Sequence, residues 1–397
     1  MKLSRCAFLI SLLFAWTCAA QSQTTNLQLR LEPRTNGLDL IVDGVADVGA
    51  LFIYRASDLQ SLSASPAVAV QTNTSITNGL RFSLPPPGAA SEQMFFKATH
   101  WPSRTVEELV CGGPGMVVIP SGSFAMGDPF NDRHDGHETP VHTVQVGGFC
   151  MDKYEVTKAL WDEVYGWAIT HGYTFDYANS GQGKAANHPA HSMTWYDCVK
   201  WCNARSEKEG RVPAYYTSAA QTGVYRSGQV GVQNDWVKWN TGYRLPTESE
   251  WEKAARGGSS GHRFPWSDVE TITHSQANYY SSPAFAYDIS PTRVYHPSFQ
   301  GGGTPNTSPA GYFAPNGDGL YDMAGNVWEW CWDWYGSYGA AAQTDPRGPV
   351  AGSGRVIRGG GWNGSAIFCR SADRNSGSSP DYRGNSVGFR AVLAPGQ

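Results

Sequence analysis

Tryptophan and glycine are both abundant in this chain, and both are unevenly distributed. The 397 residues include 15 Trp and 45 Gly. Trp16 and Trp101 stand alone, whereas the other thirteen Trp lie between Trp161 and Trp362. Five Gly fall in the first 100 residues and forty in the remaining 297. This change near residue 100 predicts a domain boundary, followed by a domain with a large aromatic core and many turns.

The overall composition excludes several classes of protein. Only 16% of the residues are charged, and the net charge is −4. The many aromatic residues and the low net charge exclude intrinsic disorder, and the low charged fraction excludes a coiled coil. Because the chain has no excess of basic residues, we expect no nucleic-acid partner.

Residues 1–20 have the pattern of a signal peptide. Lys2 and Arg5 precede an apolar run from Ala7 to Trp16, and small residues follow up to Ala20. The run is too short to span a bilayer, and no later segment reaches 18 consecutive apolar residues. We therefore expect an exported chain (secreted, periplasmic or at the cell surface) without a transmembrane anchor. A buried first helix is the alternative.

Residues 24–100 alternate between apolar and polar side chains. Leu27, Leu29 and Leu31 are each separated by a polar residue, and later segments repeat the pattern. Turn signals such as Asn36-Gly37 separate these segments. The pattern predicts a small all-β module, sandwich-like with about seven strands, and residues 101–113 are expected to form a linker.

Six cysteines remain after removal of the predicted signal peptide. They are Cys111, Cys150, Cys198, Cys202, Cys331 and Cys369. An even number in an oxidising compartment permits disulfides, with fifteen possible pairings. Free cysteines packed as small apolar residues are the alternative.

Several short motifs follow one another between residues 114 and 394. They are Arg-Leu-Pro-Thr-Glu-Ser-Glu-Trp-Glu at 244–252, Gly-Asn-Val-Trp-Glu-Trp at 325–330, Arg-Gly-Gly-Gly-Trp at 358–362 and Gly-Phe-Arg at 388–390. Helices are expected after Thr157, which is a candidate N-cap, and from about residue 194 to Lys208. A third helix is expected after Thr247, because Thr247 and Glu250 have the spacing of a capping box.

In this order, the motifs resemble those of the formylglycine-generating enzyme (sulfatase-modifying factor) family. The resemblance implies an α+β fold, a variant of the C-type-lectin-like fold with little regular secondary structure and an aromatic-rich core. It also implies a chemistry, because enzymes of this family oxidise a cysteine of unfolded sulfatases to formylglycine with oxygen and copper(I). Two thiols hold the copper(I), which is a soft cation.

The chain departs from the family at the positions of these two thiols. Gly361 stands where active members have a serine, and Gly364 stands where they have the first thiol. Counted forward from Gly360, Cys369 falls on the second thiol. Counted back from the segment 370–374, it comes three residues too late. We therefore expect at most one candidate catalytic thiol, Cys369.

The resemblance also implies calcium. The family holds one calcium ion around its Gly-Asn-x-Trp-Glu motif, where this chain has Ala324, Gly325, Val327 and Glu329. Backbone carbonyls and a carboxylate are typical calcium ligands. The resemblance implies a second calcium site that begins at Asn278 and Tyr279, with Asp288 as the candidate substitute for an absent acid.

The tryptophans near these motifs suggest a ligand groove, because aromatic faces stack on sugars and peptides. Trp328, Trp330 and Trp362 are the candidates, with a core role as the alternative. With one thiol at most, the sequence favours a non-catalytic or diverged binding module for a peptide, a glycan or a cell-surface protein. A formylglycine-generating oxidase, or another metal-dependent oxygenase on this scaffold, is the alternative.

Overall fold

The computed structural model divides the chain into two compact units, Met1–Leu109 and Val110–Gln397. It describes six strands between residues 28 and 102, Cys111, and residues 115–133, 136–301 and 303–396. Side chains are described only in the second unit, where those of residues 376–378 are excepted. The expected signal peptide lies outside the described residues. No helix in the described part is long and apolar enough to cross a membrane.

The first unit contains two antiparallel three-stranded sheets. Their strands are β1 (Gln28–Arg34), β2 (Gly37–Asp43) and β5 (Leu80–Leu84), then β4 (Ala67–Thr72), β3 (Gly49–Ala56) and β6 (Phe95–Pro102), in sheet order. Leu29 and Leu31 of the alternating pattern lie on β1, and β2 begins at Gly37. The structure describes six strands where the sequence predicts about seven.

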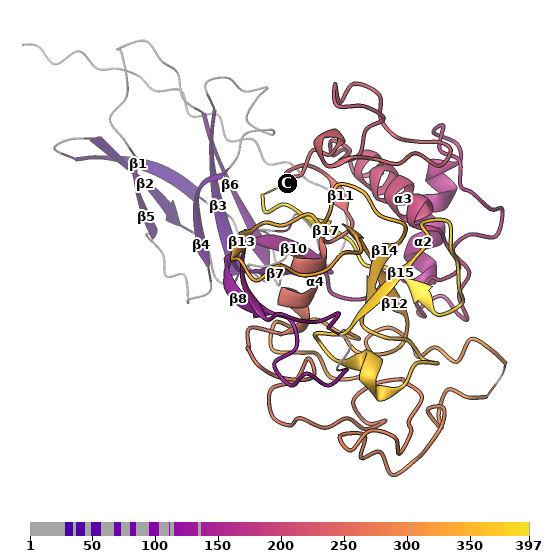
Figure 1. Ribbon diagram of the computed structural model, residues 1–397. Coiled ribbons are helices and arrows are strands. Elements are labelled where there is room, and N and C mark those ends of the chain that lie inside the picture. Colours follow the sequence, from indigo (N-terminus) through magenta and orange to yellow (C-terminus); the bar gives the residue numbers. More distant parts are fainter. Residues whose placement is uncertain are drawn as a thin grey trace, which may run out of the picture. The chain divides into compact units, whose positions relative to one another are not determined.

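Three short α-helices of the second unit begin at threonine N-caps (Figure 1). They are α2 (Lys158–Ala168), α3 (Trp195–Lys208) and α4 (Glu248–Ala255). Thr157, Thr194 and Thr247 each accept a hydrogen bond from a backbone N–H of the first turn, and Thr247 and Glu250 form a complete capping box. The helix starts expected from the sequence are therefore confirmed.

Short strands complete the second unit, in two four-stranded sheets and one three-stranded sheet among the described residues. The first four-stranded sheet has the order β11 (Tyr243–Arg244), β17 (Val392–Leu393), β10 (Phe149–Asp152) and β7 (Met116–Ile119). The second has the order β15 (Arg374–Ser378), β14 (Arg355–Arg358), β12 (Trp328–Trp334) and β16 (Val387–Gly388). The three-stranded sheet has the order β13 (Gln343–Thr344), β9 (His142–Val146) and β8 (Gly122–Met126). Short 3-10 turns occur at η2 (Asn234–Trp236) and η3 (Ala366–Cys369). Loops connect most of these elements, which agrees with the glycine-rich sequence.

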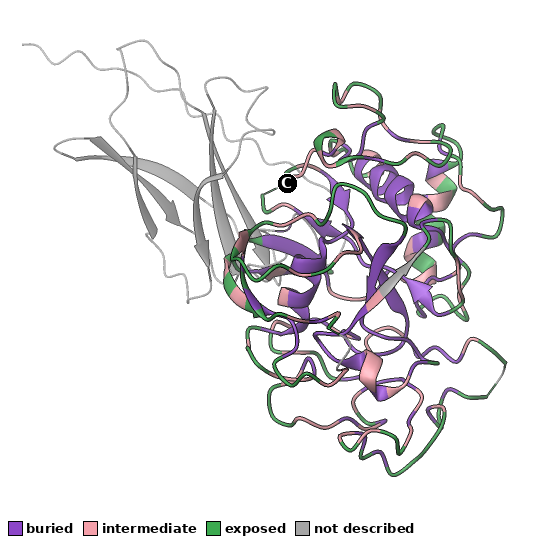
Figure 2. Cartoon of the chain, viewed as in Figure 1, coloured by how far each residue is buried: buried purple, intermediate pink, exposed green. Residues whose placement is uncertain are grey.

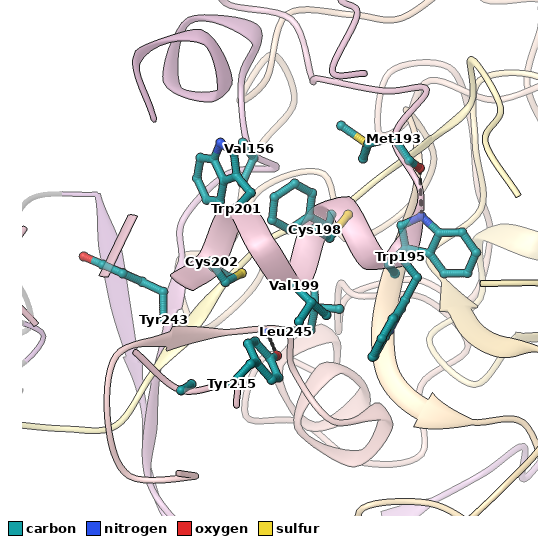
Figure 3. Close-up of a cluster of buried hydrophobic side chains, with 14 of the residues drawn as sticks. Val156, Met193, Trp195, Cys198, Val199, Trp201, Cys202, Tyr215, Tyr243 and Leu245 are labelled. Atoms are coloured by element: carbon teal, nitrogen blue, oxygen red, sulfur yellow. Dashed lines mark hydrogen bonds between the residues drawn. The ribbon is translucent and has the colours of Figure 1, made fainter. Parts of the chain in front are cut away.

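Most of the tryptophans are buried in the core of this unit. Helix α3 buries Trp195, Cys198, Val199, Trp201 and Cys202 against residues from several other segments (Figure 3). The rings of Trp161 and Trp201 stack with centroids 5.9 Å apart. Figure 2 shows that α3, β12 and β14 are almost entirely buried, whereas the loops are exposed along much of their length. The aromatic core is therefore formed largely by residues of the few helices and strands.

One disulfide joins Cys111 to Cys150, with an S–S distance of 2.02 Å. It connects the start of the second unit to β10. The remaining cysteines of the described part, Cys198, Cys202, Cys331 and Cys369, are free and buried. Both predictions for the cysteines are therefore confirmed for different residues: two form a disulfide, and four are free and buried.

Candidate functional site

The segment that follows β14 carries the positions of the two family thiols. Gly359 and Gly360 have φ angles of +91° and +76°, so both favour glycine. A Cβ at Gly360 would lie 2.8 Å from the carbonyl oxygen of Phe368. By contrast, Gly361 and Gly364 do not have positive φ, and a Cβ there would come no closer than 3.1 Å and 3.3 Å to any neighbour. The φ angles therefore do not require glycine at the serine and thiol positions, although the neighbours of an added Cβ would have to shift by a few tenths of an ångström.

Cys369 ends the 3-10 turn η3 and is fully buried. It packs in an apolar cluster with Tyr279, Ala324 and other residues. Burial raises the pKa of its thiol well above the ordinary value. The other free cysteines belong to different buried clusters: Cys198 and Cys202 lie on α3 in one cluster, and Cys331 lies on β12 in another.

These observations test the copper site that the resemblance implies. Copper(I) is held by paired thiolates, and here one position is Gly364 while the remaining thiol is sealed in apolar surroundings. No cluster of three or more His, Cys, Asp or Glu side chains in the described residues is arranged to hold a metal. The residues present do not fit copper(I).

Half-exposed aromatic rings surround the backbone at Gly364. The N–H of Tyr280 donates to the carbonyl oxygen of Gly364 at 2.8 Å. The rings of Tyr280 and Tyr295 meet edge to face at 5.1 Å, and Tyr295 lies 5.7 Å from Trp362. A Cβ at Gly364 would lie 3.3 Å from Phe368. We call Tyr280, Tyr295, Trp362 and Phe368 the aromatic surface; Tyr280, Tyr295 and Phe368 are half-buried.

The three tryptophans expected to line a groove occupy different surroundings. Trp330 is fully buried, and its indole N–H donates to the carbonyl oxygen of Met193. Trp328 is 7% exposed and its ring lies 5.7 Å from Phe368. Trp362 is 4% exposed and belongs to the aromatic surface. Trp328 and Trp362 therefore lie beside the thiol positions, whereas Trp330 packs in the core.

The expected calcium segments lie next to each other. Asn278 pairs with Gly325 in a parallel bridge, and a Cβ at Gly325 would lie 2.3 Å from the carbonyl oxygen of Asn278. Glu329 receives two hydrogen bonds from Arg390, at 2.6 Å and 2.7 Å, and one from Trp251 at 2.8 Å. The carboxylate of Glu329 is therefore already engaged by a cation.

Two further buried acids, which the sequence did not predict as site residues, lie near Glu329. The Glu155 carboxylate accepts hydrogen bonds from Asn326 at 2.7 Å and from the N–H of Val327 at 3.1 Å. The Asp322 carboxylate accepts one from the N–H of Gly311, and its Oδ1 is buried without a partner. Burial and the neighbouring carboxylates raise the pKa of Glu155 well above its ordinary value. Three buried acids thus surround the single guanidinium of Arg390.

This surplus of buried carboxylate is a feature that a divalent cation would neutralise. A cavity of about 270 Å³ reaches Asp322, Met323 and Ala324, with Trp266 and Asp268 also on its wall. The residues fit calcium here provided that backbone carbonyls supply part of the coordination, because side chains alone form no such cluster in the described residues. Asp322 lies just before the motif, and Glu155 is 171 residues away from Asn326, so only Asp322 offered a local signal.

The second expected calcium segment has a different environment. The Oδ1 of Asn278 is buried without a partner, but the carbonyl oxygen of Tyr279 faces the Nε2 of His274 at 3.1 Å. The Asp288 carboxylate accepts hydrogen bonds from Tyr279, Ser281 and the backbone of Ser282. Asp288 therefore stabilises its own loop and has no free oxygen for a cation.

Comparison with known proteins identifies the second unit. Residues 103–395 match the family model of the Sulfatase-modifying factor enzyme 1-like domain. The formylglycine-generating enzyme of Streptomyces coelicolor is 34% identical over 70% of this chain and 88% of its own length. The chaperone protein LppX of Paenibacillus barcinonensis is 33% identical over 62% of this chain and 78% of its own.

A solved structure gives the same result for the fold. Treponema denticola variable protein 1 superposes with a TM-score of 0.53 and 29% identity, over 70% of this chain and 95% of its own. The mixed α and β architecture with little regular helix agrees with it. The expected C-type-lectin-like fold is confirmed, and this chain belongs to the formylglycine-generating enzyme (sulfatase-modifying factor) family.

Proposed function

We propose that this chain is an exported, non-catalytic binding protein built on the formylglycine-generating enzyme scaffold. One observation carries the proposal: glycine stands at the first thiol position although the backbone there does not require it, and Cys369 is buried in an apolar cluster. A thiol without solvent access or a thiol partner cannot supply a copper(I) site. The scaffold itself is intact, and scaffolds of this kind can carry different functions.

The aromatic surface is the proposed binding site. Half-exposed rings at Tyr280, Tyr295 and Phe368 offer flat apolar area with few rotatable bonds, which suits peptides and sugars. The LppX relative carries the name of a chaperone, which favours a protein or peptide ligand over a small molecule. Export is supported by the signal-like residues 1–20 and by the Cys111–Cys150 disulfide, because disulfides persist in oxidising compartments.

Catalysis is tested directly on the purified protein. It is supplied with copper(I), oxygen, a thiol reductant and a peptide that contains the sulfatase motif Cys-x-Pro-x-Arg. We expect no aldehyde by mass spectrometry. Aldehyde that forms with the parent protein and disappears in Cys369→Ser would overturn the proposal and establish the oxidase.

Binding is tested with peptide and glycan arrays probed with the parent protein and with Tyr295→Ala. We expect at least one ligand class to bind the parent and to lose about two- to tenfold in affinity in the variant, because a stacked ring contributes about 0.5–1.5 kcal/mol. Tyr177→Ala is the matched control, since Tyr177 is an exposed tyrosine on the loop before α3. Equal loss in both variants would contradict the assignment of the surface.

We also propose that calcium binds at residues 322–329, as a structural ion. The support is the surplus of buried carboxylates around Arg390 and the unpartnered Oδ1 of Asp322. A bound calcium ion would supply the positive charge that Arg390 alone does not provide for the three carboxylates. Gly325, Val327 and Ala324 would contribute carbonyl oxygens, and Asp322 and Glu155 would contribute carboxylates.

A further inference from the structure

A second cavity, away from the aromatic surface, is lined by an arginine that forms no hydrogen bond or ion pair with the described residues. The cavity has a volume of about 130 Å³ and lies between the β9–β10 turn, the start of α4 and the loop after β13. Four charged residues line it, namely Arg244, Glu250, Asp345 and Arg347. Three of them have strong partners within the unit, and the fourth does not.

Arg244 and Glu250 neutralise each other. Their side chains form a double hydrogen bond with both distances at 2.7 Å, and both residues are buried. Asp345 accepts a hydrogen bond from the N–H of Gly147 at 2.7 Å. Its own N–H donates to the carbonyl oxygen of Gln145, next to the pairing of β13 with β9. These contacts fix the loop that leads to Arg347.

Arg347 forms no ion pair or hydrogen bond with the described residues. Its guanidinium lies 4.1 Å from the ring centroid of Trp239 and is half-buried. Trp239 is itself held in place, because its indole N–H donates to the carbonyl oxygen of Asn234 and its ring meets Trp332 edge to face. Burial and the nearby Arg244 lower the pKa of Arg347 from its ordinary value. The guanidinium is thus oriented by stacking while its hydrogen-bond donors have no partner in the unit.

We propose that this cavity binds a carboxylate group, with Arg347 as the anchor. A guanidinium presents parallel N–H donors that match the two oxygens of a carboxylate. Because its contact with the Trp239 ring already restrains the guanidinium, the side chain loses less conformational freedom when the ligand binds. The small volume suits a single acidic group, such as the side chain of Asp or Glu in a partner peptide or a free small acid. Asp345 lies on the same cavity wall, and its negative charge opposes anions of higher charge more strongly than a single carboxylate.

The inference does not depend on the proposed function, because it concerns a different cavity and different residues. It is tested by titrating acetate into the full protein and following the Nε–H signal of Arg347 and the indole signal of Trp239 by NMR. Chloride at equal ionic strength and methylammonium chloride serve as controls for charge screening and for cations. We expect a saturable shift with acetate alone.

Arg347→Gln should weaken acetate binding by about tenfold or more, because the substitution removes the charged donors that would hydrogen-bond to the ligand. Arg347→Lys keeps the charge but loses the fork, so we expect an intermediate loss. Arg383→Gln is the matched control, since Arg383 also stacks on a ring, that of Tyr177 at 3.8 Å, outside this cavity. Shifts that never saturate, that appear equally with chloride, or that persist in Arg347→Gln would overturn the proposal.

Discussion

Two sets of residues in the second unit are stabilised in opposite ways. In one set, which we call the framework, four buried arginines each bind a buried glutamate: Arg358 binds Glu252, Arg370 binds Glu138, Arg374 binds Glu248 and Arg390 binds Glu329. The stretch 359–369 contains no charged residue and ends at a thiol in an apolar cluster. The contacts that maintain the fold are therefore separate from the positions of the family thiols. A chain of this family can lose the thiols and keep the fold.

The largest effect is expected on the framework side, at Arg358. This arginine donates to Glu252 at 2.5 Å and to the carbonyl oxygens of Ser371 and Ala372. Arg358→Met leaves the Glu252 charge without one of its two arginine partners in the interior, which is expected to decrease the free energy of unfolding by about 3–5 kcal/mol. Urea denaturation measures the change.

Arg226→Met is the control for that substitution. Arg226 pairs with Glu207 near the surface, with side chains 39% and 21% exposed, so we expect a loss below about 1 kcal/mol. Equal losses in the two variants would mean that burial does not distinguish the framework pairs.

A smaller effect is expected at a buried histidine that has no acid partner. His191 is 1% exposed, its Nδ1 contacts the hydroxyl of Ser192, and its Nε2 has no partner. Burial lowers its pKa from 6.5 to about 4. Below pH 6.5 the unfolded chain binds a proton that the folded chain does not, so stability falls as the pH decreases from 6.5 to 4.

The loss at pH 4 should be on the order of 3 kcal/mol. His191→Asn does not titrate and should therefore be less sensitive to acid over this range, as measured by thermal unfolding at several pH values. His171→Asn, which changes an exposed ring, should follow the parent curve. Identical pH dependence of His191→Asn and the parent would contradict the prediction.

Calcium bound at residues 322–329 is expected to stabilise the folded protein. At a hundredfold excess over its Kd, calcium is expected to stabilise the folded protein by about 2.7 kcal/mol, seen as a higher Tm that EDTA reverses. Asp322→Asn keeps an acceptor for the N–H of Gly311 but removes a charge, so the calcium response should be lost or greatly reduced.

Asp268→Asn provides the comparison, because Asp268 lines the same cavity but is exposed. It should retain the calcium response. A protein whose Tm is unaffected by both calcium and EDTA would refute the calcium site.

The smallest effect is expected within the apolar stretch. Gly364→Cys places a thiol at the family position, and its Cβ meets nothing closer than 3.3 Å at a φ that is not positive. The free energy of unfolding should change by less than about 1 kcal/mol. Because Cys369 remains buried, the variant should form no aldehyde in the copper(I) assay. Aldehyde in this variant would show that the Cys369 thiol reaches the site, which would contradict its burial in the structure.

Local sequence signals were sufficient for part of the fold. The caps at Thr157 and Thr247 involve residues three positions apart, and the motif order identified the family. The sequence also placed Gly361 and Gly364 at the serine and thiol positions. The predicted ligand groove was less specific. Trp328 and Trp330 alternate in the same motif and cannot be distinguished in the sequence, whereas of these two only Trp328 contacts the aromatic surface.

The amino-acid sequence by itself determined the family, the helix starts and the absence of a thiol at position 364, because each depends on residues close together along the chain. The tertiary structure decided which charges are neutralised and which groups are sealed. Arg358 and Glu252 are 106 residues apart, and the placement of Arg347 on Trp239 depends on the pairing of β13 with β9. Pairings of this kind follow from packing over long sequence separations, for which no local pattern exists.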